Sequence, residues 1–169
     1  MSNRVSLREY QRKLSARLAN VEAGQAASKL SVQIGKAGWL VDLADAGEVI
    51  PVPSITSVPL THAWFAGVAN IRGNLYSVVD FAAVLGAAPS EPVEQSRLLL
   101  LHGKYRVSAA LLVDRVLGMH GSAQLQHKRD ADRMARWVKA EYTDSSGKVW
   151  HELDVPQLTQ HADFLNVGI

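Results

Sequence analysis

The stretch FAGVANIRGNLYSVVDF, residues 65–81, carries the strongest structural signal of the sequence. Two apolar segments flank Arg72 and Gly73, and a glycine at this place permits a tight turn of the backbone. The second segment, LYSVV, is rich in residues that favour β-strands, and it runs into Asp80. An arginine in so apolar a region is either a buried structural cation or a charge held out toward a partner.

The neighbouring sequence predicts further short strands that are joined by turns. We expect three hairpins: LSVQI and WLVDL flank GKAG, RLLLLH and YRVSAALLVD flank a tight Gly-Lys turn, and AEYTD and KVWHEL flank SSG. Short strands with turn signals at regular intervals are typical of small β-barrels or a sandwich. Strands and helices do not alternate along the chain, so nothing favours a parallel sheet. The sequence therefore predicts a mostly β fold.

Prolines and capping residues mark where regular structure bends or ends. GEVIPVPSITSVP contains three prolines, which cannot donate to a sheet ladder, so it predicts an edge strand or a bulged strand. Asp80 is a suitable N-cap for a helical turn over DFAAVLG, which Gly86 would end. Residues 121–137 are polar and mixed in charge, which predicts a solvated loop with some helix.

Both ends of the chain carry helical patterns. Apolar residues at steps of three and four make residues 5–22 an amphipathic helix, followed by a linker of small residues. This helix either docks on its own domain or binds a partner or a membrane surface. We therefore separate residues 1–27 from one domain over residues 28–169. Asp154 predicts the N-cap of a short C-terminal helix, and an apolar tail is expected to pack back on the domain: Phe164, Leu165, Val167 and Ile169.

Composition excludes several classes of protein. The 169 residues contain no cysteine, which excludes disulfides, zinc–thiolate sites and thiol nucleophiles and suits a reducing compartment. The net charge of +2 is weak for a nucleic-acid-binding protein, so we expect no nucleic-acid partner. No segment resembles a signal peptide, and no apolar run is long enough for a transmembrane helix, so we expect no direct membrane insertion.

A search for catalytic motifs gives no candidate. No P-loop, Gly-x-Gly-x-x-Gly or Gly-x-Ser-x-Gly pattern is present, and the six histidines show no metal-ligand spacing. We therefore expect no catalytic residue, metal or cofactor and no enzymatic activity. Because catalytic triads assemble in space rather than in sequence, a small β-barrel hydrolase stays open as an alternative. Core positions are predicted for three tryptophans: Trp39, Trp137 and Trp150.

Two motifs together resemble the signatures of the CheW-like family, over about residues 28–160. The first comprises Gly67-Val68, Asn70-Ile71-Arg72-Gly73, Val78-Val79-Asp80-Phe81 and Leu85-Gly86, and the second is ALLVDRVLGMH, residues 110–120. Within the family, WFAGVANIRGNLYSVVDF and the tail QHADFLNV most resemble the adaptors of type IV pilus twitching motility. Tyr76-Ser77 departs from the family pattern, which often has proline there, and residues 121–140 match poorly.

The resemblance implies a fold and a function. It implies two packed five-stranded β-barrels, which are SH3-like lobes on a shared core. It implies a non-catalytic adaptor between the cytoplasmic tip of a methyl-accepting chemoreceptor and the regulatory domain of a CheA-like histidine kinase. Such an adaptor is cytoplasmic and is recruited to membrane-associated chemoreceptor arrays. Flagellar chemotaxis is the alternative pathway to twitching motility, and a coupling domain related to receiver proteins is a further rival.

The resemblance also assigns residues to a partner-binding site. The receptor-facing groove is expected to be shaped by Val68, Asn70, Arg72 and Gly73. The proline-marked edge strand is expected to face the kinase with Glu48, Val49, Ile50 and Val52, although proline there also protects an edge from pairing. Structural roles are expected for Gly67, Asp80, Asp114 and Gly118. Alternatively, Arg72 is braced by a local carboxylate such as Asp80.

Overall fold

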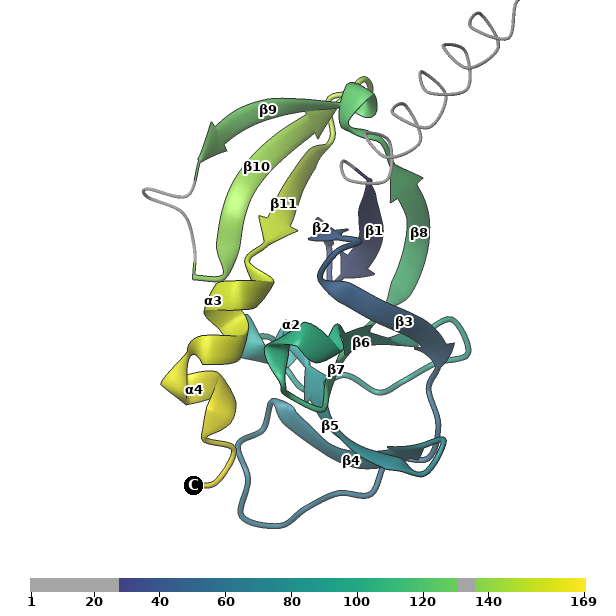
Figure 1. Cartoon of the computed structure of the whole chain (residues 1–169), viewed down its shortest axis with the longest axis vertical. Helices are drawn as coiled ribbons and strands as arrows, with labels where there is room; N and C mark the ends of the chain where they lie inside the picture. The colour runs from purple at the N-terminus through teal and green to yellow at the C-terminus, as the bar shows by residue number, and fades with distance from the viewer. Residues whose placement is uncertain (1–27, 131–135) are drawn as a thin grey trace, which may run out of the picture.

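The computed structural model describes residues 28–130 and 136–169, so the predicted helix over residues 5–22 lies outside the described residues. The described chain forms two sheets (Figure 1). The six-stranded sheet has the order β8-β1-β2-β11-β10-β9, with β1 Lys29–Ile34, β2 Ala37–Asp42, β8 Arg115–His120, β9 Leu125–Asp130, β10 Val138–Asp144 and β11 Val149–Leu153. The five-stranded sheet has the order β3-β6-β7-β5-β4, with β3 Ala46–Pro51, β4 Phe65–Ile71, β5 Asn74–Asp80, β6 Arg97–Leu101 and β7 Ala109–Val113.

Short helices and turns connect some of the strands, and two more helices follow the last strand. They are α2 Phe81–Val84, α3 Val155–Gln160 and α4 Ala162–Leu165, with the 3₁₀ turns η1 Gly103–Tyr105 and η2 Ser122–Gln124. Asp80 caps α2 by accepting a hydrogen bond from the Ala83 amide, and Asp154 caps α3 in the same way from Gln157, as the sequence predicts. The helices α3 and α4 run along the side of the molecule that joins the two sheets (Figure 1).

The mostly β prediction is confirmed, but the prediction of two five-stranded barrels is only partly right. Each sheet has two edge strands in the described residues, so neither forms a closed barrel, and one sheet has six strands. We call the two halves the six-stranded lobe and the five-stranded lobe. The chain enters the five-stranded lobe after β2 and leaves it after β7, so this lobe is inserted between β2 and β8 of the other.

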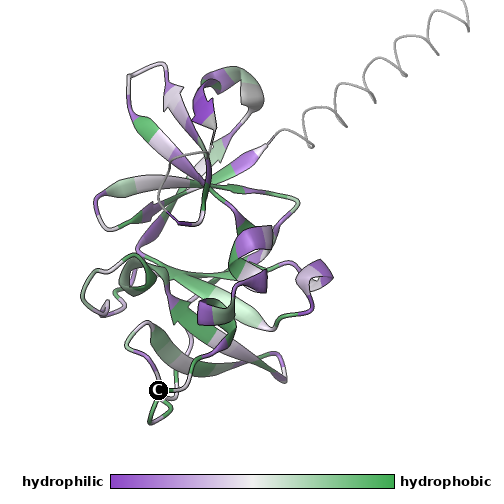
Figure 2. Ribbon diagram, turned by 90° about the vertical axis from the view of Figure 1, so that its left-hand side faces the viewer, coloured by the Kyte–Doolittle hydropathy of each residue, from purple (hydrophilic) through white to green (hydrophobic). Residues whose placement is uncertain are grey.

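The main core lies between the two sheets and a smaller one lies inside the curl of the five-stranded sheet. Strand β6 shows how the sequence produces this, because its leucines alternate between the cores: Leu99 and Leu101 join the main core, and Leu98 and Leu100 join the smaller one. A continuous apolar run is expected of a strand that is buried on both faces. Hydrophobic segments accordingly dominate the strands of the five-stranded lobe in Figure 2.

The structure corrects three expectations about local structure. In the described residues, parallel pairing occurs twice. Strands β2 and β11 pair across the whole inserted lobe, and β5 and β7 pair within that lobe, where α2 and β6 separate them in sequence. The predicted loop over residues 121–137 contains η2 and β9. Strand β9 is an edge strand whose described side chains are exposed except Leu125, so it lacks an alternating apolar pattern. The tight Gly-Lys hairpin turn is instead η1 followed by a loop.

A candidate protein-binding site on the five-stranded lobe

The motif Asn70-Ile71-Arg72-Gly73 forms the turn between β4 and β5. Arg72 and Gly73 are the two central residues, since Ile71 pairs with Asn74, and both have positive φ, +52° and +84°. Two positive φ angles are what a type I′ hairpin turn requires. The side-chain oxygen of Asn70 accepts a hydrogen bond from the Gly73 amide at 2.8 Å. Each polar residue of the motif therefore has a place in the turn.

The turn holds the Arg72 side chain against Glu48 of β3. Two parallel hydrogen bonds join them, from Nη1 to Oε2 at 2.7 Å and from Nη2 to Oε1 at 2.6 Å. This bidentate geometry fits the planar guanidinium to a carboxylate. The hydrogen bond from Arg72 holds the pKa of the Glu48 carboxyl below its usual value, and Glu48 raises the pKa of Arg72. Both side chains stay accessible, with 72% of Arg72 and 42% of Glu48 exposed.

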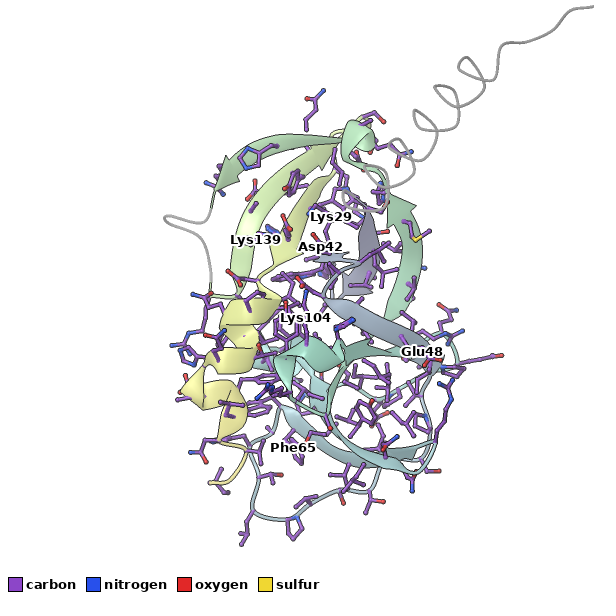
Figure 3. All side chains as sticks on the ribbon, in the orientation of Figure 1. Lys29, Asp42, Glu48, Phe65, Lys104 and Lys139 are labelled. Atoms are coloured by element: carbon purple, nitrogen blue, oxygen red, sulfur yellow. The ribbon has the colours of Figure 1, made fainter. Side chains whose placement is uncertain are left out.

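This ion pair joins the two groups of residues that the sequence analysis kept apart. Strands β3 and β4 are the opposite edges of the five-stranded sheet, so the contact exists only because the sheet curls until its edges approach. Figure 3 labels Glu48 on the five-stranded lobe. Arg72 is thus braced by a carboxylate, as the alternative predicts, but the carboxylate is that of Glu48. The suggested Asp80 is buried and caps α2 instead. The Arg72–Glu48 pair therefore places one positive and one negative side chain together where the two edges of the five-stranded sheet approach each other.

The other predicted site residues lie on or next to β3 and β4, and their side chains are partly buried. Strand β3 is an edge strand with a bulge near its start, as the prolines predict. Val49 packs against the main core, and Ile50 and Val52 pack against the smaller one, so all three are half-buried. Val68 is half-buried, and it exchanges both backbone hydrogen bonds with Thr56 of the loop before β4. Among the side chains predicted for the site, those of Asn70, Arg72 and Glu48 thus offer polar groups to solvent.

The residues assigned to structural roles have structural contacts. Asp80 accepts hydrogen bonds from the Ser90 amide at 2.5 Å and from its hydroxyl at 3.1 Å, which ties the loop after α2 to the lobe. A Cβ on Gly67 would lie 2.8 Å from the carbonyl carbon of Thr56 and closer still to its oxygen, so the bridge between Thr56 and Val68 requires glycine here.

The second motif passes from one lobe to the other. Asp114 lies between β7 and β8, and its carboxylate accepts a hydrogen bond from the Gly35 amide at 2.7 Å, in the turn between β1 and β2. Gly118 has a φ of +138° at a bulge of β8, and its carbonyl accepts a hydrogen bond from the Ser31 hydroxyl at 2.9 Å. Both residues therefore fix β8 onto the β1–β2 hairpin.

Two polar clusters, one in each lobe, escaped sequence analysis. Lys104 and Tyr105 of η1 both contact the carboxylate of Asp45, which lies just before β3. Burial and the hydrogen bond to Asp45 raise the pKa of Tyr105. In the six-stranded lobe, Lys29 and Lys139 contact the buried Glu152 at 2.6 and 3.3 Å. Figure 3 shows both lysines near Asp42 and above Lys104. Charged residues scattered through the sequence gave no spacing signal for either cluster.

The described residues give no support for two other kinds of site. Within residues 28–130 and 136–169, no three histidine, aspartate or glutamate side chains gather as a metal ion would require. In the same part of the chain, every helix is too short or too polar to cross a bilayer.

Comparisons with known proteins add the following similarities. The profile of the CheW-like domain family matches residues 29–163. Protein PilI of Pseudomonas aeruginosa is 36% identical over 109 residues, which cover 64% of this chain and 61% of that protein. Chemotaxis protein CheW of Thermotoga maritima is 32% identical over 90 residues, which cover 53% of this chain and 58% of that protein. The matches thus span about three fifths of the length of these relatives.

The fold is also shared with a solved structure. The crystal structure of the scaffolding protein TtCheW from Thermoanaerobacter tengcongensis has a TM-score of 0.65 to this chain. The similarity covers 76% of this chain and 89% of that one, at 19% sequence identity. At this identity the comparison establishes the arrangement of the two lobes and nothing finer.

Proposed function

Because this chain belongs to the CheW-like domain family, we propose that it is a non-catalytic scaffold that couples a methyl-accepting chemoreceptor to a CheA-like histidine kinase. The receptor partner is the cytoplasmic tip of the chemoreceptor, and the kinase partner is its regulatory domain. The scaffold would work in the cytoplasm, recruited to membrane-associated chemoreceptor arrays. This role needs binding surfaces and no catalytic group.

We assign the pathway to twitching motility by type IV pili. The similarity to PilI, at 36% identity over 109 residues, supports this assignment. Flagellar chemotaxis is the second candidate, since proteins named CheW are 29–32% identical over 87 to 90 residues. Deletion of the gene in its own bacterium separates the two: loss of twitching with intact swimming supports the first, and loss of swimming with intact twitching supports the second.

The observation that carries the proposal is the exposed ion pair between Arg72 and Glu48. It lies where the turn after β4 meets the edge strand β3, so one pair adjoins both predicted binding surfaces. We assign Val68, Asn70, Arg72 and Gly73 to the receptor-facing surface. We assign Glu48, Val49, Ile50 and Val52 to the kinase-facing surface, where the backbone of an edge strand is available for pairing.

The test is a calorimetric titration of the protein against the kinase regulatory domain and, separately, against a fragment of the receptor tip. Wild type is expected to bind with micromolar affinity, and Arg72→Ala to weaken binding of at least one partner about tenfold or more. Arg106→Ala is the matched control, because Arg106 is also an exposed arginine with positive φ, +56°, at the end of η1. Absence of binding by wild type to either partner would refute the proposal.

A charge exchange then distinguishes a structural pair from a direct contact. The double variant Glu48→Arg with Arg72→Glu keeps the pair and reverses its direction. If the pair acts only by closing the lobe, binding returns to the wild-type level in the double variant. If a partner contacts Arg72 itself, the double variant binds as weakly as Arg72→Glu alone.

A further inference from the structure

Strand β8 combines an open edge with protruding apolar side chains. It is an outer strand of the six-stranded sheet, and in the described residues β1 is its only hydrogen-bonded neighbour. Among the described strands, β8 is also the only one with two exposed large apolar side chains, Leu117 at 39% and Met119 at 67%. Proteins commonly cover such an edge with a helix or a loop, because it otherwise invites pairing with another chain. We call this strand, with Leu117 and Met119, the β8 edge.

The other exposed apolar side chains of the described chain do not share a strand. Most of them lie in loops or near the C-terminus, where the tail packs back only in part. Phe164 is buried, but Leu165 and Ile169 are exposed, which corrects the expectation that the whole tail docks on the domain. Single exposed apolar side chains are common on protein surfaces, so these positions carry no inference.

The described chain begins beside the β8 edge. Lys29 pairs with His120 and Leu30 pairs with Met119, so the start of β1 lies against the end of β8. Figure 1 shows these two strands side by side on one flank of the six-stranded lobe. The linker EAGQAAS, residues 22–28, leads to this point and spans at most about 25 Å. The six residues of β8 are about 20 Å long, so a helix on this linker can reach along the edge.

The predicted helix over residues 5–22 supplies an apolar stripe of matching spacing. Its apolar residues recur at steps of three and four: Leu7, Tyr10, Leu14, Leu18 and Val21. Residues four apart in a helix lie about 6 Å apart along its axis, and residues two apart in a strand lie about 6–7 Å apart. Leu14 and Leu18 therefore have the spacing of Leu117 and Met119. A helix that lies along β8 can bring these two pairs of side chains into contact.

We propose that the segment 5–22 docks its apolar stripe on the β8 edge of its own chain, as a helix that covers Leu117 and Met119. A short flexible linker gives a tethered segment an effective concentration of about millimolar, which favours this site over a separate partner. The basic residues of the segment lie off the stripe, so the docked helix presents them to solvent: Arg8, Arg12, Lys13 and Arg17. This inference does not rest on the proposed coupling function.

The test is disulfide cross-linking of the full chain, which contains no cysteine of its own. Leu14→Cys and Leu18→Cys are each combined with Met119→Cys and oxidised mildly at micromolar concentration. At least one pair is expected to form a disulfide within a single chain, because only side chains in contact meet the geometry of that bond. Ala16→Cys with Met119→Cys is the matched control. Residue 16 lies between the other two in sequence but about 200° around the helix from residue 18, so it should cross-link about tenfold more slowly or not at all.

Hydrogen exchange measures the same contact without cysteines. Leu14→Glu with Leu18→Glu is expected to speed exchange of the β8 amides that do not bond to β1 about tenfold or more, while the amides of β7 keep their wild-type rates. Ala16→Glu with Asn20→Glu adds the same charge at the same spacing off the stripe and should leave β8 unchanged. Equal cross-linking of the three cysteine pairs, or disulfides that form only between two chains, overturns the proposal. Exchange of β8 that the Leu14 and Leu18 substitutions leave unchanged overturns it as well.

Discussion

Replacement of Gly67 by alanine tests whether the β-bridge between Thr56 and Val68 can form only when residue 67 has no side chain. Gly67 has a φ of +135°, and a Cβ there would lie within 3 Å of the Thr56 carbonyl. Alanine therefore meets two separate costs: a strained backbone and a collision with the loop. The chain relieves the collision most easily by moving the loop away from β4.

The magnitude follows from these two costs. Strain at a positive φ is about 1–3 kcal/mol. Loss of the bridge removes the two hydrogen bonds between Thr56 and Val68, at 2.8 and 2.9 Å, each with a net contribution of about 0.5–1.5 kcal/mol. We therefore expect Gly67→Ala to lower the free energy of unfolding by about 2–6 kcal/mol.

Gly118 provides the matched control. Its φ of +138° is nearly the same and it also lies at a strand bulge, but a Cβ there meets no atom within 4 Å. Gly118→Ala should therefore show the strain alone, and the difference between the variants should be about 1–3 kcal/mol. Urea unfolding measures both values, and hydrogen exchange at the amides of Thr56 and Val68 reports the bridge. Equal losses of stability, or unchanged protection of these amides in Gly67→Ala, would refute the reasoning.

Three further predictions concern stability. Hydrogen bonds from the hydroxyl of Ser146 and the indole of Trp150 hold the pKa of the Asp144 carboxyl well below its usual range. Asp144 therefore stabilises the folded state at pH values above the pKa that it has in the unfolded chain, and this stabilisation is lost as the pH falls toward its pKa in the folded state. Urea unfolding at several pH values should therefore show a steeper loss below about pH 4 for wild type than for Asp144→Asn. Phe81 is fully buried, so Phe81→Ala should cost about 3–5 kcal/mol in the same assay, and a cost below about 1 kcal/mol would contradict its core position. Asn70→Ala removes the acceptor of one turn amide and should cost only about 0.5–1.5 kcal/mol in thermal unfolding, with the fold intact by circular dichroism.

The turn at Arg72 and Gly73 could be predicted from the sequence, but the contact between Arg72 and Glu48 could not. Gly73 after Arg72 predicts a turn because a glycine accepts positive φ, and the structure has that turn. Glu48 was a candidate on a different strand, and nothing in its neighbourhood points to Arg72. Their contact depends on the curl of a sheet whose edges are β3 and β4. Curl is a property of the packed sheet, so it has no signature in a single strand.

The same division applies to the fold. The hairpin of β1 and β2 and the hairpin of β10 and β11 were predictable, because alternating apolar residues and glycine turns act within a few residues. The parallel pair of β2 and β11 was not, because its partners are separated by the entire inserted lobe. Strand β9 was not predictable either, since its partner β10 supplies the hydrogen bonds and its own side chains are mostly solvated.

The insertion of one lobe into the other also sets an order of assembly during synthesis. All five strands of the inserted lobe have been made once residue 113 leaves the ribosome, whereas the β1–β2 hairpin still lacks both neighbours, β8 and β11. Until β8 and β11 follow, the two open edges of the hairpin are available for pairing with other nascent chains. The first shelter for this hairpin is the inserted lobe itself, since Val32 and Trp39 pack into the core that the two lobes share. Substitutions that delay the inserted lobe should therefore increase aggregation of the nascent chain even where the finished protein is equally stable.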